Sequence, residues 1–520
     1  MVVALLVLAV CLAAGLVLER AVRADGVPPG ELPARPAGRD SVPTEGAPEQ
    51  AGTLLAIRLA AHLFVLLCCF GLAWRPFLAG FCYLGLVGGL TVSSRIKHRI
   101  MRENVVFSDL LLVRTIIRHP RLYYLSSSDY RLYLGAFGLA GFAAAWLLLE
   151  PSLLPAGPLA PLLAPLPLLA GLGGLWGTAV RGGPPVARAA LPDVNPTASI
   201  DAAIRMVGLL GSLLTLWGAW IRMKRPPDAV AAHARKPRVH VRGNPVRRPG
   251  AAPLIVAIQC ESFLNPEGRG LAAPRLEAFE RASSQAIHAG RLRVPAFAAN
   301  TMRAEFAFLS GLPNAALGCD RFNPYLTAPA YRDVVWPTRL RRAGWQTVFV
   351  HPYDRRFFER DRVVPAIGFE RGVWQEDFGT AARRGLYVAD LAVAQRLLLE
   401  AEAAAEPTFI FAVTMENHGP WGPGRLPGLD DRLKQYLHHL QGADAMVAAL
   451  LDGLQDRPGR TVLCLYGDHV PALRGLGPEA ETGLTDFVIA DPSGRAQAGE
   501  GRALRRVEDL LALCVSAAQG

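Results

Sequence analysis

The apolar residues of this chain are concentrated at its amino-terminal end, and this distribution limits the fold more than any other feature. Long apolar runs occupy residues 2–18, 53–73, 77–93, 133–149 and 158–179. Each approaches the roughly 20 residues that a helix needs to cross the hydrocarbon core of a bilayer. The first run lacks the basic start and the cleavage site of a signal peptide, so we expect an uncleaved anchor. About five spans, give or take one, are therefore predicted.

The charges around these runs leave two membrane topologies open. The loop after the third run is rich in Arg and Lys, and basic loops usually stay in the cytoplasm. With five spans and a cytoplasmic amino terminus, this loop would lie outside. A sixth span at 206–220 would place it inside, but that stretch is short and could equally form an interfacial helix. Both arrangements can put the carboxy-terminal part of the chain outside.

The net charge of +11 owes much to a basic segment between Arg222 and Arg248. Because this segment follows the membrane region, we interpret it as facing anionic lipid rather than nucleic acid. The length of 520 residues exceeds one ordinary core. We expect a transmembrane region at 1–180, a linker with the basic segment and an optional interfacial helix at 181–250, and a folded domain at 251–520. No CxxC spacing occurs, which disfavours zinc ribbons and thioredoxin-like chemistry.

From about residue 253, short apolar strands alternate with amphipathic helices. Strands are expected at 254–260, 346–351, 408–414, 461–466 and 486–490, and helices at 274–289, 335–343, 390–404, 431–455 and 507–517. This alternation is typical of a mostly parallel sheet with helices on both faces. The predicted fold class is α/β for this domain, after an amino-terminal helical transmembrane bundle. In the helix at 431–455, we expect His438 and His439 on the solvent-exposed face.

Four of the expected strands end in an acid or a histidine, namely Glu261, His351, His418 and the pair Asp468 and His469. Because the carboxyl ends of parallel strands share one edge of a sheet, these side chains should converge on one crevice. Glu261, Asp468 and His469 offer two carboxylates and one imidazole, which suit Mn²⁺, Mg²⁺ or Zn²⁺. The sequence thus predicts a metal-assisted active site at this edge.

Thr301 is the candidate nucleophile, at the start of a short expected helix that runs to Leu309. The positive end of a helix and its free backbone amides favour a developing alkoxide or a bound phosphoryl group. A metal ion next to the hydroxyl would lower its pKa and activate it. Taken alone, a threonine after Asn300 is more often part of a helix cap. Its occurrence together with the strand-end residues is what favours a catalytic role.

These residues together resemble the lipoteichoic acid synthase branch of the sulfatase and alkaline phosphatase superfamily. The matching motifs are QCESF at 259–263, NT at 300–301, EF at 305–306, LSGLP at 309–313, MENHGP at 415–420 and YGDH at 466–469. The layout of about five spans before an external catalytic domain is similar too, so the resemblance covers nearly the whole chain. The segment at 103–109 looks like one that lies outside after the third span in this family, which favours five spans.

The resemblance implies one divalent ion, most commonly manganese, with magnesium or zinc as alternatives. Thr301 would attack the phosphodiester of an anionic phospholipid such as phosphatidylglycerol, expel diacylglycerol and pass phosphoglycerol to a glycan or glycolipid. The implied metal ligands are Glu261, Thr301, Asp468 and His469, and the implied substrate contacts are His351, Phe358, Arg360 and His418.

Elementary chemistry agrees with several of these implied roles. Arg360 could hold phosphate oxygens bidentately, and His418 could protonate a leaving alkoxide. His351 is equally well explained as a satisfied histidine at a strand end. Phe358 stands where the family usually has tryptophan, which keeps a ring but removes the indole donor. The exact headgroup of the donor is therefore open.

Several other activities fit the sequence less well. A sulfate ester hydrolase needs Cys or Ser in a Cys-x-Pro-x-Arg context, and the segment from Thr301 to Glu305 provides neither that residue nor the proline. The Asp468-His469 pair is followed by VPA instead of the Gly-Glu-Ser usual in phosphoethanolamine transferases of the lipid A type. A phosphodiesterase of the same superfamily and a phosphoethanolamine transferase remain the main alternatives. A silent scaffold is disfavoured by the complete ligand set, and a transporter because no apolar run carries paired buried charges.

We therefore expect a multi-pass enzyme of the bacterial inner membrane whose catalytic domain lies in the periplasm or outside. Its composition, rich in Arg, Ala and Pro, fits a bacterium with a GC-rich genome. Periplasmic glucans, capsule and other envelope polymers are all open as the acceptor.

Overall fold

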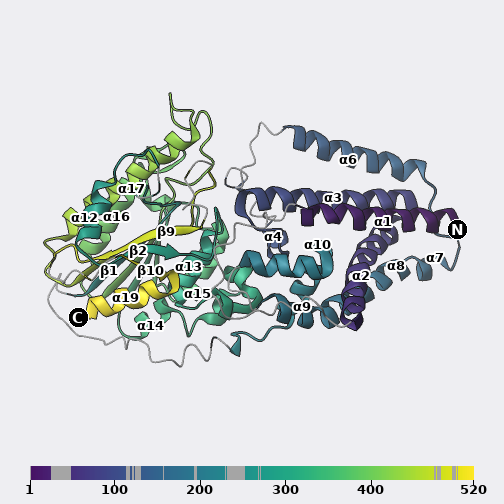
Figure 1. Ribbon diagram of the computed structural model, residues 1–520, viewed down its shortest axis with the longest axis horizontal. Helices are drawn as coiled ribbons and strands as arrows, with labels where there is room; N and C mark the ends of the chain where they lie inside the picture. Colours follow the sequence, from purple (N-terminus) through teal and green to yellow (C-terminus); the bar gives the residue numbers. More distant parts are fainter. Residues whose placement is uncertain are drawn as a thin grey trace. The chain divides into compact units, whose positions relative to one another are not determined.

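The computed structural model describes most of the chain as two compact units. The described residues are 2–24, 48–112, 118–119, 122, 130–155, 157–191, 196–228, 230, 252–267, 269, 271–473, 476, 482–494, 499 and 502–519. The amino-terminal unit comprises Met1–Pro120 and Leu125–Met223, and the carboxy-terminal unit comprises Arg121–Tyr124 and Lys224–Gly520 (Figure 1). Most of the basic segment that we expected to face lipid lies outside the described residues.

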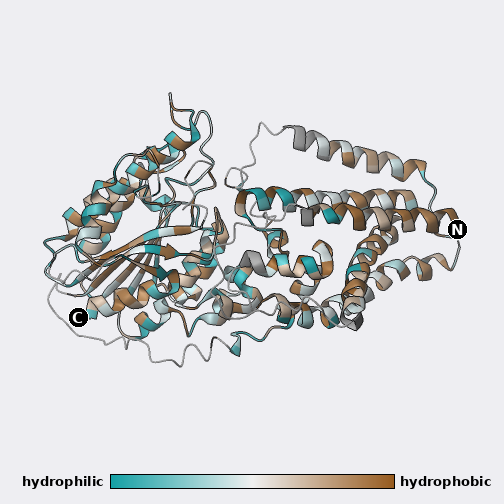
Figure 2. Cartoon of the chain, in the orientation of Figure 1, coloured by the Kyte–Doolittle hydropathy of each residue, from teal (hydrophilic) through white to brown (hydrophobic). Residues whose placement is uncertain are grey.

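The amino-terminal unit is helical. Its helices are α1 (Val2–Ala24), α2 (Pro48–Ala73), α3 (Pro76–Met101), α4 (Phe107–Leu111), α6 (Tyr130–Leu149), α7 (Ala160–Leu163), α8 (Leu166–Gly177), α9 (Gly183–Ala190) and α10 (Pro196–Arg222). Apolar side chains dominate these helices, as the brown colour in Figure 2 shows. The helices α8 and α9 are joined by a π-helical turn at Thr178–Gly182.

Five described stretches of this unit are long and apolar enough to cross a membrane. They are Val2–Val22, Ala51–Ala73, Pro76–Met101, Ala160–Ala190 and Ser199–Arg222. The run at 133–149 lies in α6, of which the described apolar stretch is Phe137–Leu149, and the residues at 206–220 belong to the long α10. Polar residues before 206 interrupt the apolar run but not the helix, which is why the sequence pattern underestimated α10.

A buried cluster of ionisable side chains joins α1, α2 and α3. Glu19, which is 2% exposed, lies 2.9 Å from the guanidinium of Arg58 and 3.2 Å from Nε2 of His62. The other ring nitrogen of His62 lies 2.7 Å from the hydroxyl of Tyr83. The run at 2–18 ends just before Glu19, and the run at 53–73 contains Arg58, so neither run shows the pair by itself. Our expectation of no paired buried charges missed this pair because only the packing of the helices brings the two together.

The same cluster supports a break in α10. Gly208 has a φ of 76°, which interrupts the helical backbone. The amide of Leu210 donates instead to Oε1 of Glu19 at 2.8 Å. A side chain at position 208 would collide with Glu19 and Arg58, so the glycine allows both the break and the close approach.

The carboxy-terminal unit contains a mostly parallel sheet. The described residues form eight strands in the order β10-β2-β9-β8-β1-β7-β3-β4. These strands are β1 (Leu254–Cys260), β2 (Ala286–Arg293), β3 (Gln346–Val350), β4 (Arg371–Val373), β7 (Thr408–Val413), β8 (Thr461–Gly467), β9 (Leu484–Ala490) and β10 (Arg502–Arg506). Only β9 runs antiparallel to its neighbours β8 and β2. A separate two-stranded ribbon pairs β5 (Arg383–Arg384) with β6 (Tyr387–Val388).

Helices cover both faces of this sheet, so the expected α/β class is confirmed (Figure 1). One face packs against α12 (Glu277–Ser284), α16 (Asp390–Glu402) and α17 (Arg432–Leu454). The other packs against α13 (Thr301–Ser310), α14 (Trp336–Arg342), α15 (Arg360–Ala366) and α19 (Val507–Gln519). Alternate residues of β1 enter the two cores, as the pleat of a strand requires. Both cores are therefore built on the same central strands.

Two local expectations were wrong. The helix expected at 274–289 ends at Ser284, and the residues from Ala286 form β2 because they pair with β9 and β10. His439 is fully buried rather than exposed, since its Nδ1 lies 3.1 Å from Oε1 of the buried Glu416. A sequence pattern that counts only apolar residues cannot show such a partner.

Candidate metal centre and active site

Three of the predicted ligands meet at the carboxyl edge of the sheet. Glu261 follows β1, and Asp468 and His469 follow β8, the parallel neighbour of β1. One ligand atom from each residue lies within 4.8 Å of the others, and all three residues are buried. The register of two adjacent strands therefore produces the cluster that the strand-end pattern predicted.

The cluster has more negative charge than its surroundings neutralise. Oδ1 of Asp468 accepts hydrogen bonds from the amides of Ser262 and His469, both at 2.9 Å. Oδ2 is buried and has no hydrogen-bond partner among the described residues. Burial and the Asp468 carboxylate raise the pKa of Glu261 to about 8. Within the described part of the chain, no Lys or Arg forms an ion pair with either carboxylate. A bound cation would relieve this imbalance.

His469 is oriented as a metal ligand would be. Its Nδ1 lies 3.1 Å from the carbonyl oxygen of Val470. A carbonyl can only accept, so Nδ1 carries the proton in the neutral ring and Nε2 presents a lone pair. That nitrogen faces Oδ2 of Asp468 at 3.2 Å and Oε1 of Glu261 at 3.6 Å. A positive charge between this lone pair and the two ionised carboxylates would be favourable, so these residues fit a divalent ion.

Thr301 begins α13 and is tied to the same edge through its main chain. Its carbonyl accepts from Nε2 of Gln259 at 3.4 Å, and Gln259 lies on β1 two residues before Glu261. The Oε1 atom of Gln259 accepts from the hydroxyl of Tyr466 on β8 at 2.7 Å. One side chain thus connects β1, β8 and the first residue of the helix. Thr301 itself is 7% exposed.

Several residues beside the site adopt strained backbone conformations. Ser262, Asn300, Phe358 and Glu359 all have positive φ values, between 53° and 65°. Such values cost a non-glycine residue about 1–3 kcal/mol each and persist only where the surroundings enforce them. The strain flanks Glu261, Thr301 and Arg360, which are three of the predicted functional residues.

Arg360 and His351 lie together in a buried network. The guanidinium of Arg360 lies 2.7 Å from Oε2 of Glu305 and 3.1 Å from Nε2 of His351. The other ring nitrogen of His351 lies 3.0 Å from the carbonyl of Val413, so both nitrogens are engaged. Burial and the Arg360 charge lower the pKa of His351 well below its usual value. These contacts match a satisfied strand-end histidine.

Glu305 had no assigned role in the sequence interpretation. It lies one helical turn after Thr301 in α13, is fully buried and also bonds the hydroxyl of Tyr325. The spacing of four residues was a signal, because residues i and i+4 share one face of a helix. Phe358, at the expected aromatic position, is half-buried, and its ring centroid lies 5.3 Å from the guanidinium carbon of Arg360.

His418 lies in the loop after β7. Its Nδ1 lies 2.6 Å from the carbonyl of Gly419, and its ring centroid lies 5.9 Å from that of Tyr387. Desolvation lowers the pKa of this half-buried histidine to about 4, so the ring is neutral at pH 7. The predicted site residues therefore form one central cluster, one buried Arg–His network and one loop histidine.

Two residues that the sequence interpretation missed hold this loop. Arg425 donates to the carbonyls of Glu416 at 2.6 Å and Pro420 at 3.1 Å, and also to that of His418. The buried Glu416 side chain accepts from the amide of Asp390 at 2.7 Å and contacts His439. The loop backbone around His418 is thus held on both sides.

Comparison with known proteins gives consistent matches. The model of the family described as Sulfatase matches residues 253–518. A capsular polysaccharide biosynthesis protein, RkpI of Rhizobium meliloti (strain 1021), is 34% identical over 82% of this chain and 80% of its own length. Among solved structures, the phosphoglycerol transferase GacH of Streptococcus pyogenes has a TM-score of 0.44 at 19% identity, covering 56% of this chain and 83% of its own. The phosphoethanolamine transferase EptA of Neisseria meningitidis has a TM-score of 0.48 at 12% identity, covering 90% and 96%.

Proposed function

We propose that this chain, which belongs to the sulfatase family, is a metal-dependent transferase of a phosphoester group. It would move phosphoglycerol or a similar headgroup from an anionic phospholipid, such as phosphatidylglycerol, to a glycan or glycolipid. The observation that carries this proposal is the buried, uncompensated cluster of Glu261, Asp468 and His469 at the sheet edge to which the first turn of α13 is tied.

The residues that would hold the ion are Glu261, Asp468 and His469, with the hydroxyl of Thr301 completing the set. Carboxylate oxygens and one imidazole favour Mn²⁺, Mg²⁺ or Zn²⁺, and we propose manganese. When bound, the ion would lower the pKa of the Thr301 hydroxyl and neutralise charge on the phosphoryl group. The raised pKa of Glu261 implies that the ion displaces a proton on binding.

Thr301 would carry the transferred group. Its hydroxyl oxygen forms a bond to phosphorus, and the bond from phosphorus to the diacylglycerol oxygen breaks. In the second step an acceptor hydroxyl attacks the phosphothreonine ester and releases Thr301. The position of Thr301 at the first residue of α13 supports this role, because the free amides at a helix N-terminus favour an anionic phosphoryl group.

His418 would move the protons of both steps. The neutral ring can take the proton of the attacking acceptor hydroxyl. In the first step, an approaching phosphodiester anion would raise the pKa of His418, so that the ring can protonate the leaving alkoxide. Arg360 and Phe358 are the proposed headgroup contacts. His351 would act through Arg360, whose orientation it and Glu305 fix.

The membrane location is part of the same proposal. The five apolar stretches would place the chain in the bacterial inner membrane, with the sulfatase unit on the outer side. The relative RkpI is named for capsular polysaccharide biosynthesis. An envelope polysaccharide or its lipid-linked precursor is therefore our proposed acceptor.

The test is a single-turnover experiment on the full-length protein in phosphatidylglycerol vesicles. With Mn²⁺ present, we expect release of diacylglycerol and a phosphoglycerol adduct on the peptide that contains Thr301, read by mass spectrometry. Thr301→Ala should show neither product, whereas Ser310→Ala, at the other end of the same helix, should show both. Full diacylglycerol release by Thr301→Ala would reject the nucleophile. Rapid appearance of free glycerophosphate without a stable adduct would favour the hydrolase.

A further inference from the structure

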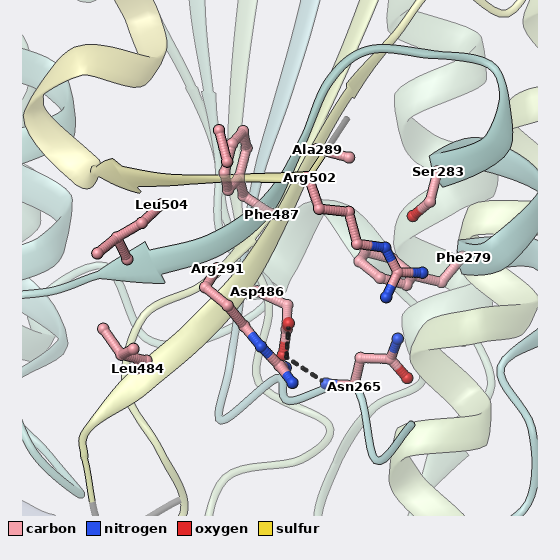
Figure 3. A pocket seen from close by; sticks show the side chains of 12 residues that line it. Asn265, Phe279, Ser283, Ala289, Arg291, Leu484, Asp486, Phe487, Arg502 and Leu504 are labelled. Atoms are coloured by element: carbon pink, nitrogen blue, oxygen red, sulfur yellow. Dashed lines mark hydrogen bonds and ion pairs between the residues drawn. The ribbon is translucent and has the colours of Figure 1, made fainter. Parts of the chain in front are cut away.

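A cavity lies in the carboxy-terminal unit, apart from the residues assigned to the candidate site. It has a volume of about 270 Å³ and is lined by α12, β2, β9, β10 and the loop after β1. Figure 3 shows Arg291, Asp486 and Asn265 directed toward one another on one side of it. Arg502, from β10, extends toward the α12 side, where Phe279 and Ser283 lie. The cavity thus combines charged, polar and aromatic side chains.

The cavity lies near the edge of the sheet that carries the metal cluster. The pairing of Tyr466 with Phe487 places the end of β8 level with the start of β9. The hydroxyl of Thr485 donates to the carbonyl of Gly467, the residue before Asp468, at 2.8 Å. Asn265, four residues after Glu261, donates its amide to Asp486 at 2.8 Å. The loop that carries Glu261 therefore lines the cavity through Asn265, and β9, which also lines it, is hydrogen-bonded to the residue before Asp468.

The strand order separates this cavity from the proposed donor contacts. The cluster sits on β1 and β8, in the middle of the order β10-β2-β9-β8-β1-β7-β3-β4. His351 and His418 follow β3 and β7, on one side of the cluster, whereas the cavity lies over β9, β2 and β10, on the other. β2 lies two strand spacings from β8, which corresponds to a distance of about 10 Å. An extended glycan could reach from the reacting phosphorus into this cavity.

The lining has an excess of positive charge. Asp486 is shared between Arg269 at 2.9 Å and Arg291 at 2.7 Å. Arg502 is 62% exposed and lies 3.6 Å from Glu267, a loose ion pair that leaves its guanidinium accessible. Among the described residues that line the cavity, Arg291, Arg502 and Asp486 are charged, which gives this lining one net positive charge. A negatively charged ligand would complete it.

The rest of the lining matches a sugar ring. Phe279, Leu484 and Leu504 supply apolar surface, and Asn265, Ser283 and Asp486 supply hydrogen-bonding groups. Sugars present both kinds of surface, an apolar C–H face and a rim of hydroxyls. The small volume suits one ring rather than a lipid chain or a whole oligosaccharide.

We propose that this cavity is a subsite for an acidic sugar residue of the glycan that accepts the transferred group. That the bound glycan is the acceptor rests on the proposed function, whereas the binding of an acidic sugar is inferred from the cavity alone. It makes the acceptor an anionic polysaccharide and assigns Arg502 and Arg291 to its recognition.

The experiment titrates the full-length protein in detergent with trigalacturonic acid and, separately, with maltotriose, a neutral chain of the same length. We expect the acidic chain to bind and the neutral chain to bind at least tenfold more weakly. Arg502→Ala should weaken binding of the acidic chain about tenfold, the usual loss for one charge-assisted hydrogen bond. Raising the salt concentration should weaken it too.

Arg506→Ala is the matched control. Arg506 lies on the same strand, is 45% exposed and has a similar 3.6 Å ion pair, with Glu508, but it does not line the cavity. Binding by Arg506→Ala should equal that of the unmodified protein. Equal binding by Arg502→Ala, no binding of trigalacturonic acid, or equal binding of both trisaccharides would each overturn the proposal.

A second measurement separates this proposal from the proposed function. Release of diacylglycerol from phosphatidylglycerol by the unmodified protein tests the donor side alone. If the unmodified protein releases none but still binds trigalacturonic acid through Arg502, the transferase proposal fails and the acidic-sugar site stands. If release is normal and Arg502→Ala binds as well as the unmodified protein, only the subsite fails.

Discussion

Each unit of this protein buries a glutamate beside a histidine, and the two clusters are neutralised in different ways. In the amino-terminal unit, Glu19 contacts His62 and also the guanidinium of Arg58, at 2.9 Å. The cation is supplied by the chain itself. The amide of Leu210 donates to the second oxygen of Glu19, so both carboxylate oxygens are satisfied.

In the carboxy-terminal unit, no Lys or Arg among the described residues pairs with the corresponding carboxylates. Glu261 and His469 share their site with Asp468, which adds a second negative charge instead of a positive one. One oxygen of Asp468 is left without a partner among the described residues. A buried charge without a counter-charge is costly. The difference indicates that the residue types Glu and His alone do not distinguish a proposed metal site from a structural cluster, and that the charge balance around them must be counted as well.

Removal of a ligand should have the largest effect. In Asp468→Ala the cluster loses one of its two charges, so we expect loss of bound metal and a fall in turnover of at least about 10³-fold. Elemental analysis of the purified protein and diacylglycerol release measure the two effects. Glu19→Gln, the matched change in the other cluster, should keep a full metal content. One bound ion per chain in Asp468→Ala would remove the distinction between the clusters.

Removal of the internal cation should mainly affect stability. In Arg58→Met, the buried Glu19 is left unpaired, which should cost about 3–5 kcal/mol of unfolding free energy. Thermal unfolding in detergent measures this loss, and metal content should not change. The double variant Arg58→Met with Glu19→Met should recover much of the stability, because both charges are gone. If the double variant is no more stable than the single one, the pair is not the balanced ion pair that we describe.

Stability of the metal-free protein should fall as pH rises. The pKa of Glu261 lies at about 8 in the folded chain against an ordinary 4.5, so the folded state binds more protons between these values. This contribution is fully present below about pH 4.5 and is lost as pH rises through 8, with a size on the order of 5 kcal/mol. Unfolding at pH 5 and pH 8.5 after chelation measures it. Glu261→Gln should abolish this dependence of stability on pH, and saturating Mn²⁺ should reverse its sign. An unchanged pH dependence in Glu261→Gln would contradict its assignment to Glu261.

The sequence was sufficient for features that local pattern determines. Glu261, Asp468 and His469 could be predicted because each follows an apolar strand, and parallel strands bring their ends together. The pair of Glu19 and Arg58 could not, since the two residues belong to different helices, and nothing in either run shows which side chain it will face. The same reason explains why the burial of His439 was missed.

The strands at the sheet margin show a second limit. The residues of β2 have a mixed pattern of buried and exposed positions, and β10 alternates exposed and half-buried residues. Neither is an apolar run, and each exists because a neighbouring strand offers a partner, β9 for β2 and β2 for β10. The cavity that we assign to an acidic sugar lies against these strands, so its residues were also absent from the sequence prediction. Features that depend on pairing of distant segments thus required the structure.

The third glutamate–histidine pair, Glu416 with His439, tests the comparison with the smallest expected effect. Here Glu416 has a distant guanidinium, from Arg384 at 3.6 Å, and two hydrogen bonds, so we classify the pair as structural. An added methyl at Gly442 would lie 2.5 Å from Oε1 of Glu416 and would displace it.

In Gly442→Ala we therefore expect unchanged metal content and a fall in turnover of about tenfold. The displaced carboxylate would shift the loop that carries His418, and a shift of about 1 Å in a catalytic group can lower the rate up to about a hundredfold. Turnover of phosphatidylglycerol and elemental analysis measure the two. Gly453→Ala on the same helix is the control, since its methyl meets only the flexible Leu398 side chain. If Gly442→Ala loses its metal and Gly453→Ala does not, Glu416 belongs to the metal centre, and the distinction between balanced and unbalanced clusters fails.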